Sequence, residues 1–273
     1  NELRPTLFLA QLSNLLAGNI SIVHGVTDSS RTFMGEEMAG VSAIETAVRQ
    51  IQEDQGDIFL VGGAYVAERA DMLLLFELGK GLWKGKYTPV WGRAGTNGGM
   101  VLGSASAFLI LESRKHAEAR GIRPYARICT ALSDRSNRKP GAAGAVSEKM
   151  FSRLTGDISQ GPLAVVTGAC GIEPELSEER VFLEGLANKG YEPSIRALST
   201  VFGNSVEAQF PLGIALSALA ISNGAFYDPF DKSGVETAYT AELSRVLVSN
   251  WGHWRGEGMA LVDAPEGPLR GKA

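Results

Sequence analysis

Hydrophobic and polar residues follow two different periods along this chain, and residues 28–64 show both of them most clearly. Residues 30–35 alternate and carry a bulky apolar pair, which predicts a strand. After a sharp turn, apolar residues recur at the spacing of one helical face. These positions are Val41, Ile44, Val48 and Ile51. Residues 57–64 form a short apolar run closed by two glycines, a pattern typical of a buried parallel strand.

The rest of the chain repeats these two patterns in alternation. Helices are predicted over residues 6–17, 70–83, 114–121, 148–154, 178–189 and 212–222. Strands are predicted over residues 100–112, 127–132, 162–170, 198–202, 245–249 and 258–262. We expect the first helix to stop at Gly18, and residues 70–83 to form either a buried helix or a packed loop. Strands that alternate with helices favour a layered α/β fold with largely parallel sheets.

A run of small residues, 103–107, interrupts the strand predicted over residues 100–112. Such a break in a strand usually permits close approach of another backbone. Residues 84–99 and 133–147 are rich in glycine and predict loops. The order of elements before and after residue 127 is similar, although the two parts share little sequence.

Composition narrows the classes of function. A chain of 273 residues can bury a large core, and its net charge of −4 argues against nucleic acid as the main ligand. Two cysteines, Cys129 and Cys170, are too few for a disulfide framework and favour a cytoplasmic location. No apolar run reaches the roughly 18–20 residues that span a bilayer, so no membrane span is expected. We find no metal-ligand spacing and expect neither a metal nor a cofactor.

The chain starts with Asn-Glu-Leu-Arg-Pro, without an initiator methionine or the pattern of a signal peptide. We therefore expect it to begin partway through a longer gene product.

The turn before the helix, residues 35–40, reads Gly-Glu-Glu-Met-Ala-Gly. It resembles the nucleophile turn of the β-ketoacyl-acyl-carrier-protein synthases of the thiolase superfamily, Thr-Ala-Cys-x-x-Gly. The ungapped match runs from residues 15–25 to residues 61–64. The resemblance implies a thiolase-like layered αβαβα fold with mixed, mostly parallel sheets, lacking its N-terminal part. It implies two related halves, residues 1–126 and 127–273, and a role in fatty-acid or polyketide biosynthesis.

The catalytic residues of that family are replaced in this chain. The cysteine that carries the acyl group falls on Glu37 and the first histidine on Ala169. The lysine and the second histidine fall on Ser199 and Asn204, in an alignment that could shift by one residue without meeting a lysine or histidine. In the loop that resembles Phe-Gly-Phe-Gly-Gly-x-Asn, His253 replaces an aromatic gate residue. The resemblance therefore implies the fold of the family, whereas the residues that catalyse the family's reaction are not intact in this chain.

Four residues are candidates for a remaining pocket: Glu37, Cys170, Asn204 and His253. Glu37 could mimic a malonyl carboxylate or stabilise an empty pocket, could be solvated, or could be a base. Asn204 is either a structural amide or a donor to an oxyanion. Cys170 is either a small buried hydrophobe or a relocated nucleophile.

The three histidines have plainer alternatives. His253 could form an acid–base pair with Glu257 or be an ordinary loop residue. His24 and His116 have no evident partner in the sequence and are expected at the surface or in helix packing.

We consider three functions. The first is a catalytically inactive subunit, similar to a chain-length factor, that pairs through residues 31–35 with an active synthase. The second is an acyltransferase or malonyl decarboxylase with altered catalytic residues, and the third is a binding module for acyl groups or acyl carrier protein. Expected partners are acyl carrier protein and a second synthase-like chain, in a homodimer or heterodimer. The basic residues to test against the carrier protein are Arg31, Arg93, Arg135, Arg138 and Lys139.

Overall fold

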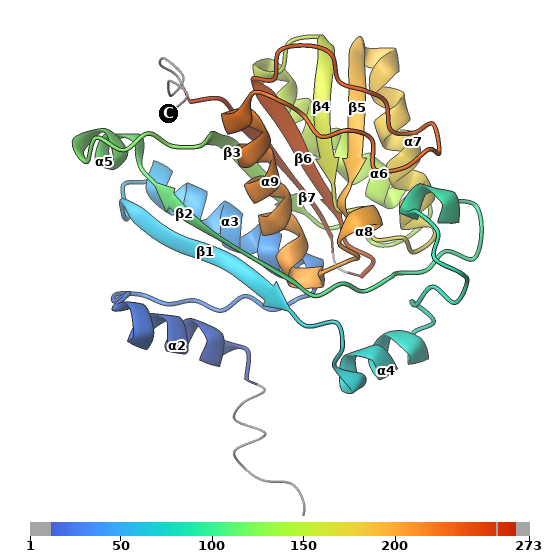
Figure 1. Cartoon of the computed structure of the whole chain (residues 1–273), viewed down its shortest axis with the longest axis horizontal. Coiled ribbons are helices and arrows are strands. Elements are labelled where there is room, and N and C mark those ends of the chain that lie inside the picture. The colour runs from blue at the N-terminus through green and yellow to red at the C-terminus, as the bar shows by residue number, and fades with distance from the viewer. Residues whose placement is uncertain (1–11, 255, 266–273) are drawn as a thin grey trace, which may run out of the picture. The chain divides into compact units, whose positions relative to one another are not determined.

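The computed structural model describes residues 12–254 and 256–265, and the chain forms two units, residues 1–34 and 35–273 (Figure 1). The described part of the first unit contains the helix α2 (Asn14–His24). Residues 6–11 of the helix expected over residues 6–17 lie outside the described residues. α2 continues past Gly18 because one glycine within a helix costs only about 1 kcal/mol. It ends instead at Gly25, whose φ of 62° is the left-handed conformation of a helix cap.

The strand expected over residues 30–35 is not formed. Residues 29–34 have no regular secondary structure. An alternating sequence becomes a strand only where a neighbouring strand satisfies its backbone hydrogen bonds. In the described part of the chain, these residues pair with no strand. Pairing with another chain through residues 31–35 therefore stays a prediction.

The second unit begins with the turn at Gly35 and alternates helices and strands. Its helices are α3 (Glu37–Gln52), α4 (Ala70–Leu78), α5 (Arg114–Ala119), α6 (Ala142–Leu154), α7 (Glu175–Gly185), α8 (Leu198–Val201) and α9 (Gln209–Asn223). Its 3₁₀ turns are η1 (Val90–Arg93), η2 (Thr155–Asp157), η3 (Leu186–Lys189) and η4 (Val206–Ala208). Its strands are β1 (Ile58–Tyr65), β2 (Ala105–Glu112), β3 (Arg127–Asp134), β4 (Gly161–Thr167), β5 (Tyr191–Ala197), β6 (Arg245–Trp251) and β7 (Glu257–Asp263).

The described strands form two sheets, of which the larger has mixed direction. The larger sheet has the order β3-β7-β6-β4-β5, and β1 pairs with β2 in a second sheet. β4 is parallel to β5 and β6, whereas β7 is antiparallel to both β3 and β6. β1 and β2 are also antiparallel. The expectation of mixed sheets is confirmed, but the expectation that they are mostly parallel is wrong for the described strands.

The two faces of the larger sheet bury separate cores because side chains alternate along each strand. On one face, Leu163, Val165 and Leu247 pack with α6 and α7. On the other, Val166 and Val248 pack with α3 and α9, which lie between this sheet and the β1–β2 sheet (Figure 1). The layers therefore follow the order β, α, β, α within residues 35–265, consistent with the expected layered α/β fold.

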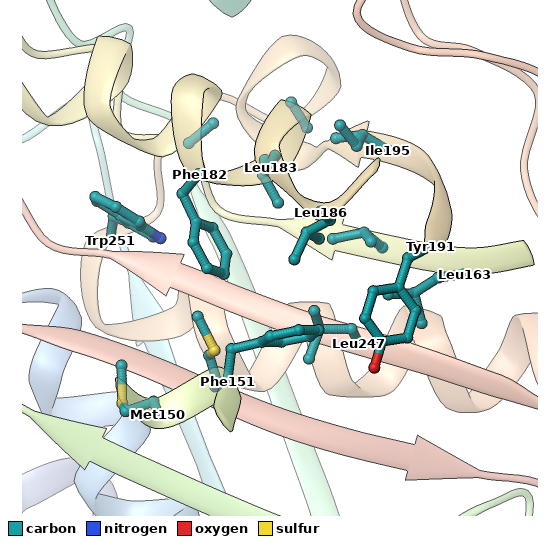
Figure 2. Packing of buried hydrophobic residues seen from close by; sticks show 14 of the residues in the cluster. Met150, Phe151, Leu163, Phe182, Leu183, Leu186, Tyr191, Ile195, Leu247 and Trp251 are labelled. Atoms are coloured by element: carbon teal, nitrogen blue, oxygen red, sulfur yellow. The ribbon is translucent and has the colours of Figure 1, made fainter. Parts of the chain in front are cut away.

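Aromatic rings fill much of the core beneath α6 and α7 (Figure 2). Phe151 meets both Phe182 and Tyr191 edge to face, with 6.0 Å and 5.4 Å between ring centroids. Trp251, the last residue of β6, packs 5.9 Å from Phe182. This core anchors the end of β6 and so fixes where the following turn begins.

The strand predicted over residues 198–202 is wrong, since α8 occupies those residues. The strand of this region is β5, seven residues earlier in the chain, where Pro193 and Arg196 obscure the apolar pattern. β5 is an edge strand, where a proline is tolerated because one side of the strand needs no sheet partner. Arg196 is buried and donates to the backbone oxygens of Tyr227 and Thr237, so its charge does not exclude it from the interior.

Two other predictions overestimated burial. The segment expected as a buried parallel strand is β1, which is antiparallel and partly exposed. The segment expected as a buried helix or packed loop contains α4, in which only Phe76 is buried. An apolar run shows that a segment can be buried, but not how much protein lies on each side of it.

The close approach expected at residues 103–107 is confirmed. A side chain at Gly103 would place Cβ only 1.7 Å from the backbone oxygen of Phe202. The backbone N–H of Gly103 donates to the oxygen of Asn204, 2.9 Å away. Gly103 thus lets the chain before β2 lie directly against the loop after α8.

Candidate functional site

Glu37 is the first residue of α3 and its side chain is almost completely buried, with 1% of its surface exposed. The preceding turn has left-handed backbone at Gly35 (φ 134°) and at Glu36 (φ 51°), a conformation that costs a non-glycine residue free energy. The turn directs Glu37 inward. The N-terminus of a helix favours negative charge because its backbone N–H groups point outward along the axis.

Glu37 forms an ion pair with His253, which lies in the turn between β6 and β7. The Nδ1 atom of His253 lies 2.8 Å from Oε1 of Glu37, and the backbone N–H of His253 points to the same oxygen at 3.5 Å. The other carboxylate oxygen, Oε2, is buried and has no hydrogen-bond donor among the described residues. Two residues separated by most of the chain therefore meet at the position expected for the nucleophile.

The ring of His253 is enclosed by aromatic residues and carboxylates. It lies 5.5 Å from the ring of Phe76 on α4 and 5.9 Å from the ring of Trp254, measured between centroids. Burial lowers the pKa of His253, but the hydrogen bond and charge of Glu37, with the charges of Glu36 and Glu175, outweigh burial and raise the pKa above its ordinary value. The imidazole is therefore held in its charged form more strongly than in water.

Ala169 and Cys170 follow β4, which ends at Thr167 instead of at the predicted residue 170. Ala169 has a φ of 39° and is fully buried, and its backbone N–H donates to Oγ1 of Thr167 at 3.3 Å. The Cys170 thiol is 1% exposed, and its pKa is raised far above the ordinary value by burial and then by the charge of Glu37. A thiol in this environment stays protonated, which argues against Cys170 as a relocated nucleophile.

Ser199 occupies the expected lysine position and belongs to a buried hydrogen-bond network. Its hydroxyl donates to the backbone oxygen of Gly168. The side-chain amide of Gln209 donates to the same oxygen at 3.2 Å and to the hydroxyl of Ser199 at 3.3 Å. The Gln209 oxygen accepts from the backbone N–H and hydroxyl of Ser205 at 2.9 Å and 2.8 Å. Because its members satisfy one another, this network holds the turn after β4 against α8 and α9.

Asn204 has a structural role in this fold. Its side-chain oxygen accepts from the backbone N–H of Val206 at 2.8 Å, and Val206 has the left-handed φ of 47° while fully buried. Its backbone N–H donates to the oxygen of Val101 at 2.7 Å. The side-chain oxygen supports an unusual conformation for a β-branched residue.

The structure brings some of the predicted site residues together and separates others. Glu37, His253 and Cys170 share one buried region, whereas Ser199 and Asn204 bond mainly to backbone groups nearby. The proposed pairing of His253 with Glu257 is wrong. Glu257 instead accepts hydrogen bonds from Arg138 and from the backbone N–H of Ser136.

Two further predictions about single residues are corrected. His116 does have a partner, since its ring bonds to Glu112, four residues earlier at the end of β2. Arg93 is fully buried and donates to the backbone oxygens of Thr88 and Gly99 at 2.8 Å and 3.0 Å. It is therefore withdrawn as a surface contact for a carrier protein, while Arg135 and Lys139 are exposed.

Sequence reasoning missed three polar residues near the site. The hydroxyl of Tyr65 is buried without a hydrogen-bond partner among the described residues, and burial together with the charge of Glu207 raises its pKa to about 12. Burial, followed by the charges of Glu37 and Glu36, raises the pKa of Glu207. Burial raises the pKa of Glu179, which bonds to Thr167 below the Ala169 turn, to about 8. No motif marks these residues, because each becomes significant only through long-range packing.

Among the described residues, no group of three or more histidine, cysteine, aspartate or glutamate side chains forms a metal-binding arrangement. In the same residues, no helix combines the length and the apolar composition that crossing a bilayer requires.

Residues 1–117 match the family model described as the β-ketoacyl synthase N-terminal domain. The chain is 33% identical over 138 residues to the oxytetracycline polyketide putative beta-ketoacyl synthase 1 of Streptomyces rimosus, and the match covers 47% of this chain. It is 26% identical over 166 residues to 3-oxoacyl-[acyl-carrier-protein] synthase 2 of Vibrio cholerae, a match that covers 57% of the chain. The N-terminal part of the chain, residues 1–117, belongs to the β-ketoacyl synthase family. The matches span only 32% and 40% of the lengths of these two relatives.

Solved structures agree with the thiolase-like fold of this synthase family. The fold is similar to a ketosynthase from a complex of type II polyketide synthase ketosynthase with its acyl carrier protein, with a TM-score of 0.82 and 16% identity. That similarity covers 97% of this chain and 70% of the ketosynthase chain. The ishigamide ketosynthase/chain length factor is also similar, with a TM-score of 0.66 and 20% identity, over 83% of this chain and 59% of the other. The expected family and fold class are therefore confirmed.

Proposed function

We propose that this chain is a catalytically inactive member of the β-ketoacyl synthase family that acts in the cytoplasm as a partner subunit of an active synthase. The observation that carries the proposal is the buried Glu37–His253 ion pair, at the position where the resemblance implies a nucleophilic cysteine. At this position the chain carries a carboxylate that pairs with an imidazolium at 2.8 Å. It therefore has no thiolate there that could accept an acyl group.

The remaining catalytic positions support the same proposal. Decarboxylation of a malonyl thioester needs donors that stabilise the enolate and a group that handles the proton. Ala169 offers no side-chain donor, and Ser199 uses its hydroxyl on a backbone oxygen. Cys170 is held as a thiol by its burial.

A partner role fits the relatives that the chain resembles. Structures with this fold include a ketosynthase/chain length factor and a ketosynthase in complex with an acyl carrier protein. In a heterodimer, this chain would supply structural surface to the acyl site of an active synthase and so influence product length. The exposed Arg135 and Lys139 are suited to contact an acidic carrier protein.

The test combines the chain with an active synthase, acyl carrier protein and malonyl substrate. We expect the chain alone to form no condensed product and the mixture to form products whose length distribution differs from that of the synthase alone. An unchanged length distribution, with no complex detected by size-exclusion chromatography, would refute the partner role. Condensed product from the chain alone would refute its inactivity.

A further inference from the structure

The turn between β6 and β7 is fastened to the N-terminus of α3. Within the turn, the backbone N–H of Gly252 donates to the oxygen of Gly256 at 2.8 Å. A Cβ at Gly252 would lie 3.3 Å from Oε2 of Glu37, so the turn packs closely on that carboxylate. The ring and the backbone N–H of His253 converge on the other oxygen of Glu37. His253 therefore connects two elements that are far apart in the sequence.

The charged groups that act on His253 are carboxylates from two helices. Glu36 and Glu37 belong to the start of α3, and Glu175 is the first residue of α7. Phe76, which contributes the ring contact from α4, carries no charge. Arg138 acts on Glu175, and the protonated thiol of Cys170 faces the charge of Glu37. The carboxylates around His253 therefore favour the protonated, positively charged form of its ring.

Loss of the proton from His253 would change this balance. The imidazole could still donate one hydrogen bond, but the ion pair with Glu37 would be gone. Glu37 would then be a buried carboxylate without a cation next to it, which is a costly arrangement. Moving the turn away from α3 would let water reach Glu37 and relieve that cost.

We propose that His253 is a pH-dependent clamp, which holds the β6–β7 turn on α3 when it is protonated and releases the turn when it loses its proton. The pKa of His253 is raised above its ordinary value, so the clamp stays closed to a higher pH than an ordinary histidine would allow. It opens as the pH rises through that raised value. This device does not depend on the proposed partner role, since it concerns only contacts within the chain.

The experiment measures hydrogen exchange of the amides of Gly252, His253 and Trp254 by mass spectrometry, corrected for intrinsic rates. Exchange is compared at about pH 6 and about pH 9, on either side of the His253 titration. For the wild-type chain we expect faster corrected exchange at the higher pH. The opening equilibrium should change about tenfold for each unit by which release lowers the pKa of His253.

Three variants make the test specific. His253→Phe keeps an aromatic ring against Phe76 but cannot carry a proton, and Glu37→Gln removes the charge of the pair. Both should show the same corrected exchange at the two pH values. His116→Gln is the matched control because His116 also pairs with a glutamate, but its side chain is 34% exposed, against 11% for His253. It should keep the wild-type pH dependence.

A second measurement is made on the wild-type chain, so that its result does not depend on whether the variants fold stably. The C2–H proton signal of His253, assigned by comparison with His253→Phe, should titrate above the ordinary range of histidine. Titration at or below that range would overturn the proposal. So would equal corrected exchange of the wild-type turn at both pH values, or loss of the pH dependence in His116→Gln.

Discussion

Glu37 shows how one residue can set the chemistry of a turn. Glu36 has left-handed backbone and Glu37 is buried, and its side chain is a carboxylate where the resemblance implies a thiol. The sequence predicted the position of Glu37 and Cys170 from local motifs. It could not predict that Glu37 pairs with His253, because 216 residues separate them and no periodicity relates the two.

Replacing Glu37 by alanine should destabilise the fold. The variant leaves His253 without its counterion in a site where both side chains are largely buried, with exposures of 11% for His253 and 1% for Glu37. Breaking a buried ion pair by removing one partner typically costs about 3–5 kcal/mol. Urea denaturation should show a loss of that order, while Glu184→Ala, which removes the partner of Arg180 from an exposed pair, should cost far less. Equal losses in the two variants would contradict the assigned importance of the buried pair.

Glu179 should make stability fall as the pH rises. Its pKa in the folded chain is raised from 4.5 to about 8 by burial, so the unfolded chain loses this proton first. Its contribution to stability is therefore present below its unfolded pKa and is lost as the pH rises through the folded value, at up to about 1.4 kcal/mol per pH unit. Glu179→Gln should flatten this part of the pH profile of the free energy of unfolding. If Glu179→Gln leaves the slope of the free energy of unfolding between about pH 5 and about pH 8 the same as in the wild-type chain, Glu179 titrates normally in the fold.

At the scale of elements, the sequence predicts the long periodic segments well, but it does not predict the segments at the periphery of the fold. α3, α9 and the central strands carry apolar patterns that packing on the larger sheet satisfies, so local sequence and fold agree. β5 was missed because an edge strand tolerates Pro193, and α4 was predicted as buried although it is mostly exposed. These errors have one physical source. Burial depends on which other elements lie beside a segment, and a single segment does not carry that information.

Gly103 offers a test of close backbone packing between elements. Gly103→Ala would place Cβ 1.7 Å from the oxygen of Phe202, and relieving that overlap requires the backbone to move. We expect a loss of about 3 kcal/mol or more in urea denaturation, as for severe overpacking. Gly144→Ala is the matched control, since Gly144 lies within α6 and a Cβ there meets nothing within 4 Å. It should stabilise the chain by about 0.5–1 kcal/mol, and equal effects in the two variants would refute the packing argument.

At the scale of the whole molecule, the fold of the second unit brings three turns together at one buried region. The turn before α3, the turn after β4 and the turn between β6 and β7 meet around Glu37, Cys170 and His253. The outward face of the β1–β2 sheet is apolar and partly exposed at Ile58 and Ile110. The division into halves at residues 126 and 127 stays a prediction. The layered fold was predictable from the resemblance to the synthase family. The buried ion pair between Glu37 and His253 was not.

The most direct measurement of the central claim is the intact mass of the purified chain after incubation with malonyl- and acyl-thioester substrates, with carbon dioxide release recorded in parallel. We predict an unchanged mass and no release above a heat-inactivated sample, since Glu37 carries a carboxylate that pairs with His253 and burial keeps the Cys170 thiol protonated. An acyl adduct, or carbon dioxide release that disappears in Glu37→Gln or Cys170→Ala, would contradict it.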